Sequence, residues 1–110
     1  MDTKQEYIKK AEYNIGDVIY HNQYDFRGVI VDVDAKFEGD DEWYNEGAEL
    51  KAPKDSPWYH VLVDEETTMA YVAEQSIRSD CSTDEVIHPM INDVFRRTST
   101  GKYMSRQSFN

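Results

Sequence analysis

Histidine and cysteine are the side chains in this sequence best suited to metal binding or nucleophilic chemistry. His21, His60 and His88 stand far apart and lack the short spacings typical of zinc ligands. His60 falls inside an apolar run, where we expect a hydrogen-bonded structural histidine and not a general base. The one cysteine, Cys81, stands among polar residues without an activating neighbour. We therefore expect neither a metal centre nor a catalytic histidine or cysteine.

A second candidate is the stretch 32–38, which reads Asp-x-Asp-x-Lys-x-Glu and partly matches a calcium-binding loop. Lys36 stands where such a loop needs an oxygen ligand, the glycine is misplaced, and Trp43 occupies the twelfth position. We interpret the stretch as a strand end that runs into a solvated loop. The sequence also has no glycine-rich phosphate loop and no serine elbow. It therefore predicts a protein that is not an enzyme and needs no cofactor.

The composition favours a small β domain. A chain of 110 residues forms one domain, and eight tyrosines with only two leucines, Leu50 and Leu62, are atypical of a helical bundle. A single cysteine excludes an internal disulfide and favours a reducing compartment. No apolar run approaches the roughly 20 residues that span a bilayer, and the first residues lack the apolar segment of a secretory signal. We expect a soluble, cytoplasmic protein without a membrane partner.

Charge is unevenly distributed along the chain. The net charge is −10, and the stretch 32–49 alone contains eight carboxylates and one lysine. The opposite holds after Asp93, where four basic residues and no acidic residue follow: Arg96, Arg97, Lys102 and Arg106. Because affinity for nucleic acids comes mostly from basic groups that neutralise phosphates, the net charge disfavours DNA as a partner.

The stretch 57–64 is the strongest strand signal. As a strand it presents two apolar faces: Trp58, His60 and Leu62 on one, Tyr59, Val61 and Val63 on the other. A strand that is apolar on both faces is typical of the interior of a sheet. Together with residues of the neighbouring strands it predicts this structural core: Val29, Val31, Trp58, Tyr59, His60, Val61, Val63 and Tyr71.

The remaining elements are short. We predict an N-terminal arm or helix (1–14), strands at 18–21, 27–34 and 68–73, a 3₁₀ turn at 76–77, a brief fifth strand at 86–87, a helix from 89 to 96, and a loose tail (98–110). Gly28 within a strand indicates a bulge or a bend. About five short strands with little helix predict a mainly β fold, namely a small SH3-like antiparallel barrel spanning residues 15–97.

The long acidic connection before the stretch 57–64 provides the candidate binding residues. Trp43 and Tyr44 either fold back as a lid on the barrel or form part of an exposed recognition patch. Arg27 either pairs with Asp25 or a loop carboxylate or meets a partner. The candidate partner-binding residues are Asp40, Asp41, Glu42, Trp43, Tyr44 and Arg27.

Several of these stretches, in this order, are similar to one known family. They are the segments 16–21 (Gly-Asp-Val-Ile-Tyr-His), 24–34 (Tyr-Asp-Phe-Arg-Gly-Val-Ile-Val-Asp-Val-Asp), 41–44 (Asp-Glu-Trp-Tyr), 57–64 (Pro-Trp-Tyr-His-Val-Leu-Val-Asp), 70–74 (Ala-Tyr-Val-Ala-Glu), and His88-Pro89 with Phe95. In combination they resemble the YccV/HspQ-like family, over residues 15 to 96. Segments 24–34 and 57–64 together form the most specific part of the match.

The resemblance implies an SH3-like β-barrel without known enzymatic activity. Family members deliver proteins to degradation, one of them together with the Lon protease, and binding of hemimethylated DNA has also been described in the family. We therefore expect a non-catalytic adaptor whose partner is an AAA+ protease or other degradation machinery. The alternative is a hemimethylated-DNA-binding protein, which the net charge of −10 disfavours. Both a monomer and a homo-oligomer such as a trimer stay open.

Overall fold

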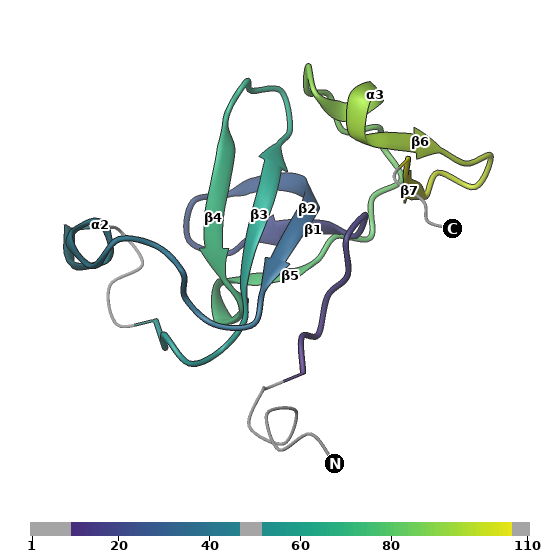
Figure 1. The fold of residues 1–110 in the computed structure, drawn as a ribbon. Helices are drawn as coiled ribbons and strands as arrows, with labels where there is room; N and C mark the ends of the chain where they lie inside the picture. The colour runs from purple at the N-terminus through teal and green to yellow at the C-terminus, as the bar shows by residue number, and fades with distance from the viewer. Residues whose placement is uncertain (1–9, 47–51, 107–110) are drawn as a thin grey trace, which may run out of the picture.

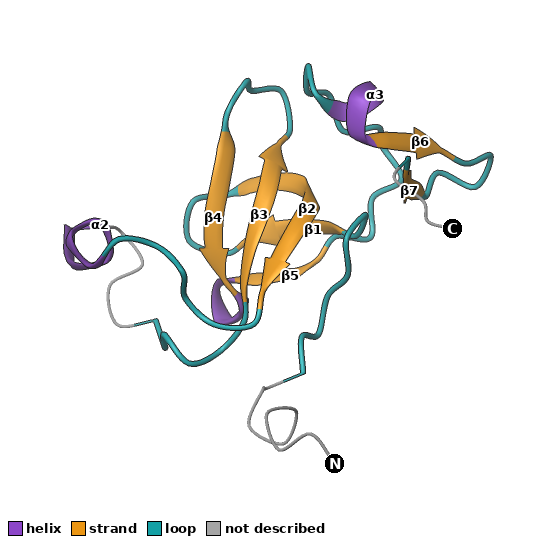
Figure 2. Ribbon diagram, in the orientation of Figure 1, coloured by secondary structure: helices purple, strands orange, loops and turns teal. Residues whose placement is uncertain are grey.

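The computed structural model describes residues 10–46 and 52–106, and strands dominate the described part (Figures 1 and 2). In chain order the elements are β1 (Val18–His21), β2 (Phe26–Asp34), α2 (Asp41–Glu46), β3 (Trp58–Val63), β4 (Met69–Ala73), the 3₁₀ helix η1 (Glu74–Ser76), β5 (Ile77–Ser79), α3 (Ile91–Val94), β6 (Phe95–Arg97) and β7 (Tyr103–Ser105). No helix in these ranges is long and apolar enough to cross a membrane.

The first five strands form one antiparallel sheet in the order β4-β3-β2-β1-β5. The predicted mainly β fold with five strands and few helices is confirmed. Strand 57–64 is an interior strand, as predicted, although β2 occupies the centre of the sheet. Within the described ranges β4 and β5 are not paired with each other, so the sheet is not closed and the predicted SH3-like barrel is not shown.

Pairing between β2 and β3 changes register at a β-bulge. Ile30 lies opposite Val61, whereas Asp32 lies opposite His60, so Val31 is the extra residue. Because side chains alternate between the faces of a strand, one extra residue exchanges the faces of everything that follows. The acidic end of β2 consequently shares the face of His60 and not the face of Ile30.

Gly28 has a different role from the predicted bulge or bend. It is regularly paired with Ile19 on one side and with Val63 on the other. A Cβ atom at this position would lie 2.4 Å from the carbonyl oxygen of Leu62 and 2.5 Å from the side chain of Val61. The glycine therefore permits the close approach of β2 and β3, while the bulge lies three residues later, at Val31.

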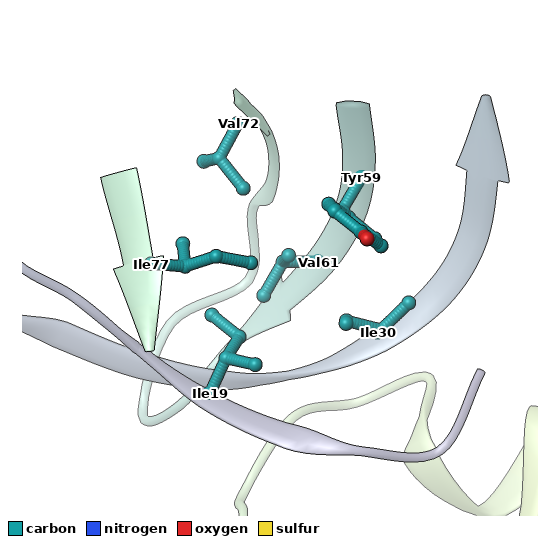
Figure 3. Packing of buried hydrophobic residues seen from close by; sticks show 6 residues of the cluster. All are labelled: Ile19, Ile30, Tyr59, Val61, Val72 and Ile77. Atoms are coloured by element: carbon teal, nitrogen blue, oxygen red, sulfur yellow. The ribbon is translucent and has the colours of Figure 1, made fainter. Parts of the chain in front are cut away.

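Two hydrophobic clusters cover the two faces of the sheet. The first includes residues from all five strands: Ile19, Ile30, Tyr59, Val61, Val72 and Ile77 (Figure 3). The second joins the sheet to the C-terminal elements: Val29, Leu62, Val86, Ile91, Phe95 and Tyr103. The alternation predicted for strand 57–64 explains this division, since Tyr59 and Val61 point to the first cluster and Leu62 to the second.

The expected core residues differ in burial. Five are buried: Val29, Trp58, Tyr59, Val61 and Val63. Three are only half-buried: Val31, His60 and Tyr71. Val31 is displaced because it is the bulged residue. His60 and Tyr71 lie opposite each other on β3 and β4, and both reach the carboxylate of Asp34 near the surface.

The C-terminal segments depart from the prediction. The fifth strand is β5 (Ile77–Ser79), and 86–87 is not a strand, because side chains bind both amides: Val86 N donates to Tyr103 Oη and Ile87 N to Asp64 Oδ1. The predicted helix from 89 to 96 is confined to α3, since Phe95 already begins β6.

The segment predicted as a loose tail (98–110) includes β7, the second strand of a β-hairpin. β6 pairs with β7, and Tyr103 is buried against Phe95, with 5.9 Å between the ring centroids. Gly16 (φ 97°) lies so close to Tyr103 that a Cβ there would be 2.3 Å from its carbonyl oxygen. The hairpin thus packs against the segment before β1. The predicted N-terminal helix falls mostly on residues 1–9, which lie outside the described ranges.

Trp58 provides the test of this packing. Its indole is fully buried, and Nε1 donates a hydrogen bond to the carbonyl oxygen of Pro53 at 3.0 Å. We expect Trp58→Ala to lower the free energy of unfolding by about 3–5 kcal/mol through the cavity that it leaves. Urea denaturation measures this change, and Met104→Ala, at an exposed site on β7, serves as the control. An unfolding midpoint equal to that of the wild type would contradict the burial of this ring.

Candidate functional site

A cluster of five aromatic rings, here called the aromatic cap, covers one corner of the β3–β4 face. Its members come from three segments: Phe37, Trp43, Tyr44, Trp58 and Tyr71. Trp58 is the centre, with ring centroids 4.9 Å from Phe37, 6.2 Å from Trp43 and 5.2 Å from Tyr71. These separations lie in the range that aromatic pairs favour. The cap therefore fixes the acidic connection onto the sheet.

The acidic residues of the connection begin α2, the helix that provides Trp43 and Tyr44 of the aromatic cap. Asp40 precedes the helix and its Oδ1 accepts a hydrogen bond from the backbone N–H of Glu42 at 2.9 Å. Carboxylates in the first turn suit the positive end of the helix dipole. Asp41 pairs with Lys54 at 2.9 Å, and the ammonium of Lys54 lies 4.4 Å from the ring centroid of Tyr44. The three carboxylates remain exposed.

Trp43 and Tyr44 combine features of the two arrangements that the sequence left open. Tyr44 is half-buried, and its hydroxyl donates a hydrogen bond to the carbonyl oxygen of Ala52. Trp43 contacts the rings of Phe37, Trp58 and Tyr71 but keeps 44% of its surface exposed. The pair thus folds onto the sheet as a lid, and the outer part of Trp43 still faces solvent.

Arg27 is engaged elsewhere. Its guanidinium donates to Asp64 at 2.8 Å, to Asp80 at 2.9 Å and to the carbonyl oxygen of Asp84 at 2.8 Å. Burial alone would lower the pKa of Arg27, but the hydrogen bonds to Asp80 and Asp64 outweigh it and raise the pKa. The sequence left open whether Arg27 pairs with Asp25, pairs with a loop carboxylate or contacts a partner. The structure shows pairing with the loop carboxylates of Asp64 and Asp80. Arg27 ties β2 to the β3–β4 turn and to the loop after β5.

Beside the cap, the bulge brings two carboxylates to an imidazole. Asp34 Oδ2 lies 3.1 Å from His60 Nε2 and accepts a hydrogen bond from Tyr71 Oη at 2.7 Å. Asp32, Asp34 and His60 each offer a potential metal ligand atom, and these atoms lie within 4.8 Å of one another. The three groups could hold a divalent cation. The contacts with His60 and Tyr71 hold Asp34 in place, and Asp32 Oδ1 accepts a hydrogen bond from the N–H of Val33 at 2.9 Å.

Sequence reasoning missed this grouping. The stretch 32–38 was judged as a linear calcium loop, and His60 was judged separately because it lies 26 positions after Asp34 in the sequence. The signal that could have joined them is the antiparallel pairing of two adjacent strands. Even that pairing would have placed Asp32 and Asp34 on the wrong face, because the bulge at Val31 was not foreseen.

Tyr71 gives the site a dependence on pH. Burial disfavours its phenolate and raises its pKa above 10.0; the hydrogen bond from its hydroxyl to Asp34 acts in the same direction, and the one accepted from Glu38 N opposes it. A pKa that is higher in the folded than in the unfolded chain stabilises the fold below about pH 10. That stabilisation is lost as the pH rises further.

We therefore expect the free energy of unfolding of the wild type to decline above about pH 10. In the variant Tyr71→Phe the same free energy should decline less steeply, because the phenol is absent. Denaturant titrations between pH 8 and pH 11.5 measure both slopes. A residual decline is expected in the variant, because burial and a hydrogen bond to Glu74 also raise the pKa of Tyr59. Equal slopes in the two proteins would contradict the conclusion that Tyr71 causes part of the decline.

The remaining observation is a comparison with known families. A family model described as hemimethylated DNA-binding protein YccV like matches residues 11–102. The match includes all five strands of the main sheet, the aromatic cap, and β6 of the C-terminal hairpin. It covers more than half of the chain, so the chain belongs to the YccV-like family.

Proposed function

We propose that this protein is a non-catalytic interaction module in regulated proteolysis, an enhancer or substrate-delivery factor for an AAA+ protease such as Lon. The family membership supports the class of protein. The single observation that supports a binding role is the exposed surface formed by Asp40, Asp41, Glu42 and Trp43, here called the acidic–aromatic surface. A partly exposed indole held in place by packed rings is a typical anchor of protein interfaces.

The charge of this surface favours a basic partner. Complementary charges accelerate encounter and oppose wrong partners, and the effect weakens as salt screens it. With a net charge of −10, the chain as a whole also attracts basic protein surfaces. We infer that the acidic–aromatic surface contacts a basic region of the protease or of its substrate.

The absence of catalysis is part of the proposal. His21 Nδ1 accepts hydrogen bonds from the backbone N–H groups of Gln23 and Tyr24, which makes this histidine part of a turn. His88 connects the carbonyl of Thr68 to the N–H of Met90. The third histidine, His60, binds Asp34. Each imidazole therefore has a structural task, which supports a binding protein over an enzyme.

We also infer an SH3-like arrangement of the sheet. β4 leads through the short helix η1 directly into β5, which pairs with β1. The first hydrophobic cluster lies inside this curved sheet and draws residues from all five strands (Figure 3). A curved sheet whose five strands all contribute to the cluster on its inner face supports a relation to small barrels.

Neutralising the acidic–aromatic surface tests the function. The triple variant Asp40→Asn, Asp41→Asn, Glu42→Gln should fold normally, since all three side chains are exposed. We expect it to lose most of the stimulation that the wild type gives to substrate degradation by purified Lon at low salt. A control triple variant, Asp55→Asn, Asp84→Asn, Glu85→Gln, has the same net charge and should retain the stimulation. No effect of the wild type on turnover, together with no binding at low salt, would overturn the proposal.

DNA binding is the second candidate, and the C-terminal hairpin is the observation that favours it. Four basic residues lie on or beside β6 and β7: Arg96, Arg97, Lys102 and Arg106. Two of them make local hydrogen bonds, Arg97 to the carbonyl oxygen of Thr83 and Arg106 to that of Asn92. So few cations on a chain of this net charge provide little phosphate neutralisation.

We expect no gel shift with hemimethylated or fully methylated duplex DNA at about 50 mM salt. Arg96→Gln combined with Lys102→Gln removes two of these four exposed cations without touching the five-stranded sheet, and it leaves the hydrogen bonds of Arg97 and Arg106 in place. A shift that is selective for hemimethylated DNA, falls with salt and disappears in this variant would favour the DNA candidate over the proteolytic one.

A further inference from the structure

The outer edge of β4 lies in an apolar groove of about 320 Å³. Residues Met69–Val72 of β4 line it, together with Tyr24 from the β1–β2 turn, His21 and Phe26 at the strand ends that flank this turn, and Trp43 from α2. Tyr24, Trp43 and Met69 are 44%, 44% and 48% exposed. The groove therefore combines a strand edge with solvent-facing aromatic and apolar side chains.

Nothing in the sequence of β4 protects this edge. The strand reads Met-Ala-Tyr-Val-Ala, without a charge or a proline. Edge strands of natural proteins usually have such residues, or a bulge, because an open edge pairs with other chains. Among the described strands β4 is paired with β3 alone, and that pairing is regular along its full length. An unprotected edge of this kind is a template for one more strand.

The register identifies the backbone groups on this edge. Val63 N donates to Thr68 O at 3.2 Å, so the next pair, Leu62 with Met69, belongs to the non-hydrogen-bonded kind. Because the two kinds of pair alternate, Ala70 exchanges hydrogen bonds with β3, whereas Met69 and Tyr71 direct their N–H and C=O groups away from β3. These are the groups that an added strand would bind.

The walls of the groove are held in place. The rings of His21 and Tyr24 stack with 5.0 Å between centroids, as do those of His21 and Phe26. The hydrogen bonds that His21 Nδ1 accepts fix the turn that contains Tyr24. On the other side the ring centroids of Trp43 and Tyr71 are 6.0 Å apart. A site preformed in this way costs little ordering when a ligand enters.

Exposed carboxylates lie next to, or within four residues of, the residues that line the groove. Asp25 follows Tyr24 in the β1–β2 turn, Glu42 precedes Trp43, and Glu65 and Glu66 lie in the turn that leads to β4; all four are exposed. Basic residues at the ends of a ligand would meet this rim favourably. A second copy of this chain pairing edge to edge would instead bring two acidic rims together, which favours a foreign segment over self-association.

We propose that the β4 edge binds an extended peptide segment of a partner protein, apolar at alternate positions and flanked by lysine or arginine, which adds as a sixth strand. Main-chain hydrogen bonds from Met69 and Tyr71 provide affinity, and the aromatic walls receive the apolar side chains. The inference rests on the proposed function, because it specifies how that interaction module holds its partner.

A synthetic peptide, Lys-Arg-Thr-Ile-Thr-Phe-Thr-Lys-Arg with blocked ends, is the probe. We expect it to bind at low salt and to slow hydrogen exchange of the Met69 and Tyr71 amides, measured by NMR. The same peptide with N-methylated backbone at alternate residues should bind at least tenfold more weakly, because it lacks the donors of the ladder. Equal binding of the two peptides, or unchanged exchange at Met69 and Tyr71, would overturn the inference.

A matched pair of variants locates the site on the protein. Met69→Lys places a charge on the edge and should weaken peptide binding at least tenfold. Met104→Lys makes the same change at a site of similar exposure, 46%, on β7 and should change the affinity less than twofold. Equal affinity of the two variants would overturn the inference, as would a concentration-dependent oligomer that Met69→Lys abolishes, since a second copy would then occupy the edge.

The degradation assay separates the two proposals. Stimulation by the wild type that Met69→Lys leaves intact would overturn the β4 site and leave the proteolytic function standing. Loss of stimulation in Met69→Lys but not in Met104→Lys supports both. Peptide binding with the expected exchange pattern but no stimulation by any variant would overturn the proteolytic function alone.

Discussion

The β-bulge at Val31 is the constraint on which the arrangement of the site depends. Before the bulge Ile30 faces the first hydrophobic cluster, and after it Asp32 and Asp34 lie on the face of His60. Without the extra residue both carboxylates would point with Ile30 into a core of isoleucine, valine and tyrosine, where a charge without a partner is very costly. One inserted residue therefore separates an apolar interior from a polar surface along a single strand.

The same face of β3 and β4 then holds the features relevant to binding. Trp58 anchors the aromatic cap, Tyr71 joins that cap to Asp34, and Trp43 extends from it toward solvent beside the open edge of β4. Each ring is fixed by its neighbours, so the surface is ordered before a partner arrives. The proposed interaction with degradation machinery and the proposed strand addition thus draw on one rigid region of the molecule.

Local patterns in the sequence were sufficient for much of the fold. The alternation in 57–64 predicted β3 and its two faces, and the strands predicted at 27–34 and 68–73 correspond to its neighbours β2 and β4. Weaker segments were assigned wrongly. Residues 86–87 have strand-like side chains, yet their amides bind Tyr103 and Asp64. The segment after 98 looked like a tail because the pairing of β6 with β7 and the burial of Tyr103 depend on contacts distant in sequence.

By itself the sequence determined the class of fold, the family and the acidic character of the connection, since β propensity, motif order and charge are properties of neighbouring residues. Only the tertiary structure decided that Arg27 pairs with Asp64 and Asp80, that His60 meets Asp34, and that the edge of β4 stays open. These outcomes depend on strand register and on which edges find a partner. A one-residue bulge alters the strand register, and segments distant in sequence determine which strand edges are covered. Neither a bulge nor a distant contact produces a periodic pattern in the sequence.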